Sequence, residues 1–176
     1  MKQLFMVGLG GKAKNANIEV HDVQFVIGES IDDTLVTLKS NWYGLSKKLH
    51  MDSYKTIEGA DGYRVIIHDT KADDSLLDKE EELSLFLVNI GGYDPKSFLE
   101  IHRIGLFAGV SANEARAKAK KVLFEEDVQA HIDNVVDVND VLKLNYNGQY
   151  SLSLVTSEDI YDIVPEWFGY KRLDIV

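Results

Sequence analysis

The stretch Leu4-Phe5-Met6-Val7-Gly8-Leu9-Gly10-Gly11 returns almost unchanged as Leu85-Phe86-Leu87-Val88-Asn89-Ile90-Gly91-Gly92. The same offset, applied without a gap, also aligns Glu19 with Glu100, His21 with His102, His50 with His131 and Asp52 with Asp133. Four of the five histidines therefore occupy duplicated positions. The repeat predicts two copies of one small structural unit, and it singles out the same few polar residues twice.

The size and composition of the chain bound its organisation. A length of 176 residues fits two units of about seventy residues each, which is small for an independent hydrophobic core. We therefore expect the two copies to pack on each other. The chain is 45% hydrophobic and 27% charged, as ordinary water-soluble globular proteins are. Its net charge of −10 argues against nucleic acid and anionic membranes as partners, because both attract basic surfaces.

The chain has no cysteine, which excludes disulfides, thiolate zinc sites and a cysteine nucleophile. Residues 1–8 are too short and too rich in glycine to resemble the apolar core of a signal peptide. No stretch reaches the length of a membrane span. A cytoplasmic location is the resulting expectation.

Each copy reads as strand, strand, helix, strand, strand. In the first copy, the apolar run before Gly10-Gly11 is typical of a buried strand that is followed by a turn. A helix is expected to begin at Ser30, because Asp33 follows at capping distance. The strands are expected at residues 4–9, 18–27, 50–57 and 62–68.

The second copy follows the same order. Its helix has the clearer start, because Ser111-Ala112-Asn113-Glu114 is a capping-box sequence. Its last two strands are expected at residues 131–138 and 149–155. The connection between them, residues 139–147, is longer than in the first copy.

These patterns divide the chain into a first repeat (residues 1–69), an acidic linker (70–84), a second repeat (85–155) and an aromatic tail (156–176). The linker contains Glu80-Glu81-Glu82, which is typical of a solvated segment. The tail contains Trp167-Phe168 and is expected to pack on the body of the protein or on a partner subunit. The predicted fold class is α+β: two tandem ββαββ repeats related by a pseudo-twofold, with mixed sheets and one helix per repeat.

The repeated motifs resemble those of a small bacterial family. They are the LFMVGLGG-like strand, the Glu-x-His step at Glu19 and Glu100, the helix after Gly-x-Ser, and the His-x-Asp strand at His50 and His131. The family is known only as domain of unknown function 1543, whose members carry one or two copies of the domain. The resemblance covers residues 3–155, although the second copy departs from the pattern at Arg103. It implies a bacterial, cytoplasmic protein without an assigned activity, and it supplies no catalytic residue.

Two short polar pairs in each copy are the candidate site residues. Glu19 and His21 lie two apart on a predicted strand and share a face, as do His50 and Asp52. The strands before and after the helix should run parallel through a right-handed crossover, which brings both pairs to one end of the sheet. Each copy would then gather four side chains: Glu19, His21, His50 and Asp52 in the first, and Glu100, His102, His131 and Asp133 in the second.

Two interpretations of these clusters stay open. Imidazole and carboxylate groups suit zinc, manganese or iron, and carboxylates serve as general bases, so the clusters suit a metal-dependent hydrolase. In the structural interpretation, a buried histidine beside a carboxylate satisfies its own hydrogen-bonding groups. The sequence favours the structural role, because ligands of open α/β sheets bind beyond the carboxyl ends of strands rather than at their amino ends. A bulge near Asp22 would turn the first pair outward.

The first functional hypothesis is a non-catalytic binding or interaction module that needs no cofactor. Duplicated small domains suit a symmetric protein partner, a peptide strand added at an open sheet edge, or self-association as a homodimer. The alternative is the metal-dependent hydrolase, with a divalent metal such as zinc or manganese. A third hypothesis, an acidic mimic of nucleic acid, rests on the net charge alone. The sequence does not decide whether the chain is an enzyme.

Overall fold

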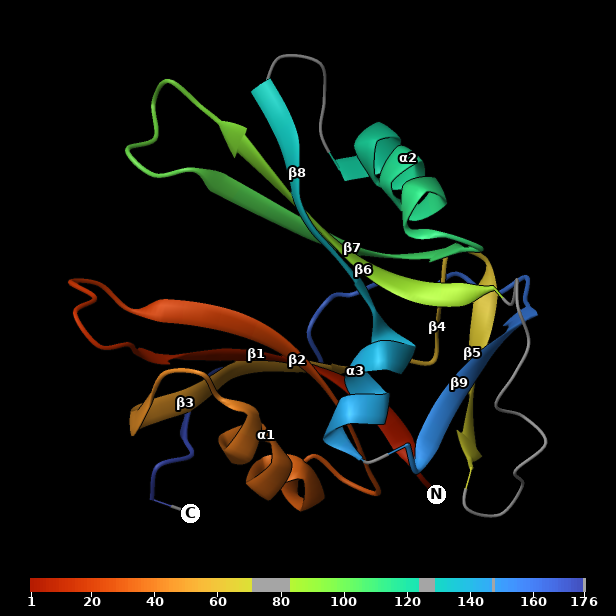
Figure 1. Ribbon diagram of the computed structural model, residues 1–176, viewed down its shortest axis with the longest axis horizontal. Helices are drawn as coiled ribbons and strands as arrows, with labels where there is room; N and C mark the ends of the chain where they lie inside the picture. Colours follow the sequence, from red (N-terminus) through yellow and green to blue (C-terminus); the bar gives the residue numbers. More distant parts are fainter. Residues whose placement is uncertain (71–82, 124–128, 147, 176) are drawn as a thin grey trace. The chain divides into compact units, whose positions relative to one another are not determined.

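The computed structural model describes residues 1–70, 83–123, 129–146 and 148–175 (Figure 1). Strands predominate over helices, and the fold class is α+β with two repeat-like halves, as the sequence predicts. The backbone divides into two compact units. Unit 1 comprises Met1–Glu58 and Ile163–Val176, and unit 2 comprises Gly59–Asp162.

Unit 1 is built on a four-stranded sheet with the order β10-β3-β1-β2. Its strands are β1 (Gln3–Lys12), β2 (Val20–Gly28), β3 (Leu45–Thr56) and β10 (Trp167–Arg172). Both β2 and β3 pair antiparallel with β1, so they run parallel to each other with β1 between them. The strands around the helix thus have the expected relative direction, but every described pairing is antiparallel, where mixed sheets were expected.

The core of unit 1 lies between this sheet and helix α1 (Leu35–Asn41). Phe5, Val7 and Leu9 alternate along β1 and are buried on the helix-facing side, because successive side chains of a strand point to opposite faces. Leu38 and Trp42, four residues apart, pack against them. The opposite face of β1 carries the buried Leu4 and Met6 near its start and only glycine at positions 8 and 10.

The predicted serine capping pairs form in both copies, but in the first copy a 3₁₀ turn (Asp32–Thr34) follows Ser30 and α1 begins only after it, at Leu35. In the first copy, the N–H of Ser30 donates to Asp33 Oδ2 at 3.0 Å and the N–H of Asp33 donates to Ser30 Oγ at 3.4 Å. In the second copy, the N–H of Glu114 donates to Ser111 Oγ at 3.3 Å. The Glu114 carboxylate accepts from the N–H of Val110 at 3.0 Å, and this hydrogen bond lowers the pKa of Glu114. These side chains satisfy N–H groups that the first helical turn leaves without partners.

Unit 2 contains the part of the second repeat that is equivalent to the sheet and helix of unit 1. Its strands are β6 (Ser84–Tyr93), β7 (Ile101–Gly109) and β8 (Gln129–Asp137), in the order β7-β6-β8, with helix α2 (Ala112–Leu123). Ala115 and Ala119 of α2 pack on Phe86, Val88 and Ile90 of β6. The β7-β6-β8 sheet therefore repeats the arrangement β2-β1-β3 of unit 1.

The last strands of the two repeats pair with each other. The second sheet of unit 2 has the order β4 (Gly59–Ala60), β5 (Tyr63–Asp69) and β9 (Tyr150–Thr156). β5 belongs to the first repeat and pairs antiparallel with β9, its counterpart in the second repeat. The compact units consequently separate after Glu58, although the sequence repeat runs to residue 69. This pairing gives the backbone N–H and C=O groups of both strands hydrogen-bond partners. No local sequence pattern predicts which strands pair in this way.

A further helix, α3 (Val138–Asn145), occupies the stretch that the sequence suggested to be a long connection. Val138 and Leu142 are four residues apart and fully buried, so they form the apolar side of a short amphipathic helix. The second repeat thus has two helices where one was expected.

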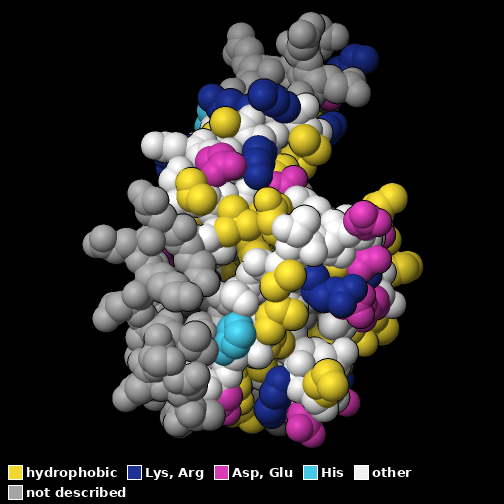
Figure 2. Space-filling model, turned by 90° about the vertical axis from the view of Figure 1, so that its right-hand side faces the viewer, with side chains coloured by type: hydrophobic (Ala, Val, Ile, Leu, Met, Phe, Trp, Pro, Cys, Tyr) yellow, Lys and Arg dark blue, Asp and Glu magenta, His cyan; other side chains and the backbone are white. Residues whose placement is uncertain are grey.

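The remaining segments are the linker and the C-terminal tail. Residues 71–82, most of the expected acidic linker, lie outside the described residues. Of the tail, residues up to Asp162 belong to unit 2, and the following residues form β10 and the end of unit 1. No helix of the described residues is both long and apolar enough to cross a membrane. On the face drawn in Figure 2, the coloured basic and acidic side chains are interspersed with hydrophobic ones.

Candidate functional site

The glycine pair of the first repeat lies inside β1 and not in a turn, so the turn expected from the sequence is wrong. A Cβ atom added to Gly10 would lie 2.6 Å from His50 Nε2 and 2.8 Å from Asp52 Oδ2. A Cβ atom added to Gly11 would lie 2.9 Å from the Trp42 ring. Glycine inside a strand is typical of such close approaches. Gly11 leaves room for the core, and Gly10 leaves room for a polar cluster on the other face.

The strands place this cluster around Gly10. In the two ladders, Gly10 pairs with His21 on β2 and with His50 on β3, so all three lie on the face opposite α1. The register of β1 and β3 shifts between Gly8 and Leu9, which leaves Asp52 as the extra residue of a β-bulge. Bulges redirect side chains, and here the bulge carries the carboxylate of the cluster. The register of β2 is regular, so the bulge considered near Asp22 is not present.

All four predicted side chains of the first copy come together. His50 Nε2 lies 3.2 Å from Glu19 Oε1 and 3.2 Å from Asp52 Oδ1. His21 Nε2 lies 3.4 Å from Glu19 Oε1 and 3.7 Å from Asp52 Oδ2. The two carboxylates therefore lie between the two imidazoles. This arrangement holds β2 and β3 together across the glycine of the central strand.

His50 is held in one orientation from several sides. Its side chain is 1% exposed, and its Nδ1 atom lies 2.7 Å from the carbonyl oxygen of Lys48. Because a carbonyl only accepts hydrogen bonds, Nδ1 carries a proton, and Nε2 faces the two carboxylates. The ring of Tyr170, on β10, stacks on the imidazole with centroids 4.1 Å apart and planes at 30°.

The residues at the end of β10 and directly after it hold this strand against β3. Leu173 is fully buried in the core of unit 1, and its N–H donates to the carbonyl of Leu49 at 2.9 Å. Asp174 accepts from Arg172 Nε at 2.9 Å and from the N–H of Lys48 at 2.8 Å. The hydrogen bond from Arg172, followed by that from Lys48, lowers the pKa of Asp174 from 3.8 to about 2. Lys48 has a φ of 67°, a backbone conformation that is uncommon for a residue with a side chain.

We expect the Asp174→Asn variant to lose a pH-dependent part of the stability. The folded-state pKa of Asp174 is lower than its ordinary value, so the stabilisation is complete above pH 3.8 and disappears as the pH falls to about 2. Urea unfolding midpoints of the parent and of this variant should therefore differ at neutral pH and converge at about pH 2. A difference that stays constant over this range would show that the ionised carboxylate does not hold β10.

The second copy assembles three of its four candidate residues. Gly91 on β6 pairs with His102 and with His131, as Gly10 pairs with its two histidines. His131 Nε2 lies 2.9 Å from Glu100 Oε1, and His102 Nε2 lies 3.6 Å from Glu100 Oε2. The register of β6 and β8 shifts at the equivalent position, so Asp133 occupies a bulge as Asp52 does, although its side chain lies outside the described residues.

The two copies differ in what covers the histidine of the third strand. The side chain of His50 is 1% exposed, whereas that of His131 is 45% exposed. In unit 1, β10 lies along the outer edge of β3. No strand of the described residues pairs with the outer edge of β8. His131 is instead stacked on Tyr93 of β6, with centroids 5.5 Å apart and planes at 23°.

The sequence did not identify the two tyrosines that stack on these histidines. Tyr170 lies outside the repeats, and Tyr93 stands where the first copy has Lys12, so the offset that revealed the other residues could not reveal them. The fifth histidine, His68, hydrogen-bonds through Nε2 to Ser153 Oγ at 2.7 Å. This bond joins β5 to β9 and is a cross-strand contact of the second sheet of unit 2.

The metal-ligand role of the clusters stays a prediction. Within the described residues, no group of three or more His, Asp or Glu side chains has an arrangement that could hold a metal ion. What the first cluster does provide is a buried, oriented histidine between two carboxylates. The second cluster provides an oriented histidine at a sheet edge, where a ligand can approach it.

Comparisons with known proteins place the chain in a family. A search of curated proteins found no match. Among solved structures, the chain is similar to the crystal structure of a protein, Il1583, from Idiomarina loihiensis. The two chains share 26% sequence identity with a TM-score of 0.70, over 98% of this chain and 99% of that one. The family model of the Domain of Unknown Function (DUF1543) matches residues 16–67 and again residues 97–147. Because these two copies cover more than half of the chain, the protein belongs to the DUF1543 family.

Proposed function

We propose that the protein is a non-catalytic interaction module that takes up an extended peptide at the outer edge of β8. One observation carries the proposal: β10 covers the edge of β3 in unit 1, while the equivalent edge of β8 has no partner strand among the described residues. The exposure of His131, compared with the burial of His50, reflects the same difference. The chain thus contains the same sheet edge twice. At β3 the edge is occupied by β10, and at β8 no described strand occupies it.

An open sheet edge is a receptive surface for a peptide. It presents a row of backbone N–H and C=O groups that a further strand can pair with, and side-chain contacts then add specificity. β10 shows how such a strand binds in unit 1, because it pairs antiparallel with β3 from Trp167 opposite Tyr54 to Arg172 opposite His50. The equivalent positions on β8 are Val135 and His131.

The partner that fits this edge is an extended segment with aromatic and basic residues, contributed by another protein. The β10 strand has this composition, with Trp167, Tyr170, Lys171 and Arg172. The net charge of the chain is −10, so a basic segment is attracted whereas a second copy of the chain is repelled. Electrostatics therefore favour a partner protein over a homodimer.

The test uses a capped peptide with the sequence of residues 167–173, added to the full-length protein. The protein's own β10 occupies β3 at the high effective concentration of a tethered segment, so the added peptide should bind to β8. We expect saturable binding, and we expect slower hydrogen exchange at the backbone amides of residues 129–137. Hydrogen-exchange mass spectrometry locates the protected strand, and fluorescence anisotropy of a labelled peptide measures the affinity.

The matched control is the same peptide with N-methylated backbone amides, which keeps its side chains but cannot pair as a strand. It should not protect β8. The proposal fails if both peptides bind equally well, if neither binds, or if protection appears only on β3. A doubled mass of the peptide-free protein in light scattering, with β8 already protected, would identify a second copy of the chain as the occupant.

A further inference from the structure

We infer that His131 is a specificity subsite for an aromatic side chain of the peptide that pairs with β8. This inference rests on the proposed function and deepens it, because it names the residue class that the open edge selects. Two observations support it. In the covered copy, where β10 lies along β3, Tyr170 stacks on His50. In the open copy, at β8, the imidazole of His131 is 45% exposed and lies against Glu100.

The covered copy shows the geometry of the contact. The register of β10 and β3 shifts between Phe168 and Lys171, so β10 carries one residue more than β3 over this interval. This irregularity takes Tyr170 out of the regular ladder, and its ring lies flat on the imidazole of His50. A bulged strand can redirect a side chain in this way without losing its remaining pairs.

In the open copy, His131 is already held in place for such a contact. Glu100 Oε1 lies 2.9 Å from its Nε2 atom. Tyr93 stacks on the ring from β6, the inner neighbour of β8. An aromatic residue of an outer strand would approach from the side away from β6, as Tyr170 approaches His50 from β10. A ring that is fixed beforehand loses little conformational entropy on binding.

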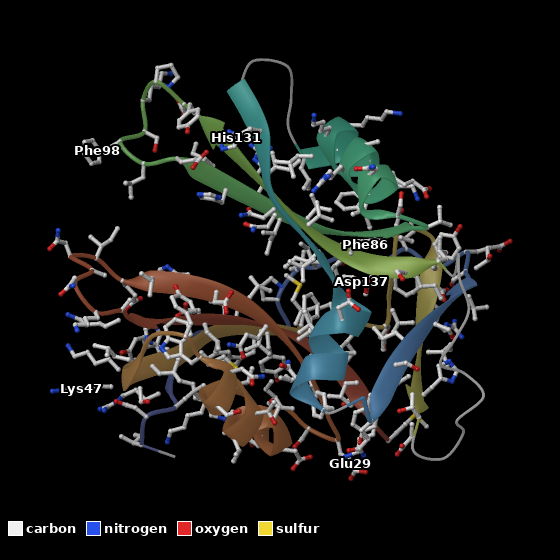
Figure 3. All side chains as sticks on the ribbon, in the orientation of Figure 1. Glu29, Lys47, Phe86, Phe98, His131 and Asp137 are labelled. Carbon is white, nitrogen blue, oxygen red and sulfur yellow. The ribbon has the colours of Figure 1, made fainter. Side chains whose placement is uncertain are left out.

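The surroundings of His131 offer further apolar surface. Phe98 is fully exposed and Leu99 is 58% exposed, in the connection between β6 and β7. Figure 3 shows Phe98 at the tip of this connection, at the same end of the β7-β6-β8 sheet as His131. The first copy has Asn17 at the position of Phe98. Exposed apolar side chains at this end of the sheet add surface that a partner can cover.

A double-mutant cycle tests the inference. The peptide of residues 167–173 and its variant with alanine in place of Tyr170 are each titrated into the parent protein and into the His131→Ala variant. We expect each single change to weaken binding by about tenfold, as the loss of an aromatic contact does. Once His131 is absent, the tyrosine of the peptide should no longer matter, so the two losses should not add.

Two protein variants sharpen the result. His131→Tyr keeps an aromatic face and should restore the preference for the aromatic peptide, whereas His102→Ala, on β7 at the far side of β6, should leave it unchanged. The inference is overturned if the alanine peptide binds the parent protein as tightly as the tyrosine peptide, or if the two losses simply add. In both of these cases β8 remains protected, so the proposed strand addition stands. Absence of binding by any peptide contradicts both.

Discussion

Replacing His50 with alanine should lower the free energy of unfolding by about 1–3 kcal/mol, as the loss of a buried, hydrogen-bonded side chain does. His50 is 1% exposed, and without it Glu19 and Asp52 face each other across a cavity. The Tyr170 ring also loses the surface on which it stacks. Urea unfolding, followed by circular dichroism, measures the change.

The duplicated sequence supplies the matched control for this experiment. His131→Ala removes the equivalent residue at a position where the side chain is 45% exposed, and it should change the free energy of unfolding by no more than about 1 kcal/mol. Both measurements should be repeated in EDTA. Equal losses for the two variants would contradict the different roles of the two histidines. A loss in His50→Ala that EDTA reproduces in the parent protein would instead support the metal-site interpretation.

The Gly10→Ala variant should be destabilised by about 1–3 kcal/mol, the usual cost of forcing extra atoms into a packed site. The new methyl group would lie 2.6 Å from His50 Nε2 and 2.8 Å from Asp52 Oδ2. Asp52 can rotate away, but His50 is fixed by its hydrogen bond to Lys48 and by the stacked Tyr170 ring. The strain therefore cannot be relieved by a side-chain movement alone.

A second double-mutant cycle identifies the source of this strain. In the His50→Ala background, the methyl group at position 10 finds space, so the Gly10→Ala change should cost much less there. Thermal or urea unfolding of the four proteins gives the coupling free energy. If Gly10→Ala costs the same in both backgrounds, the glycine is required for the backbone of β1 and not to accommodate the histidine.

Much of the local structure could be predicted from residue patterns. Strand β1 follows from the apolar run before Gly10-Gly11, and the start of α2 follows from the spacing of Ser111 and Glu114. The pair Ser30 and Asp33 correctly marks the start of the first helical segment, but a 3₁₀ turn precedes α1 there. Helix α3 was missed because its apolar pair, Val138 and Leu142, occurs in a short stretch without a capping signal. Short elements depend on tertiary contacts more than on their own propensities.

The candidate site could be predicted in part. The spacing within Glu-x-His and His-x-Asp, together with the direction of the strands, correctly brought Glu19, His21, His50 and Asp52 together. The role of the glycine pair was misjudged, because a Gly-Gly sequence is also typical of a turn, and only the positions of His50 and Trp42 show why the strand needs it.

The sequence by itself determined the duplication, the order of the first two strands and the following helix in each repeat, and the four residues of the first cluster. These properties depend on local spacing, since neighbours along a strand alternate between faces and residues four apart share one side of a helix. Only the tertiary structure decided that β5 pairs with β9, and that β10 covers β3 while β8 keeps an edge without a described partner strand. Backbone hydrogen bonds between distant strands use groups that nearly all residues share, so local spacing does not specify which strands meet.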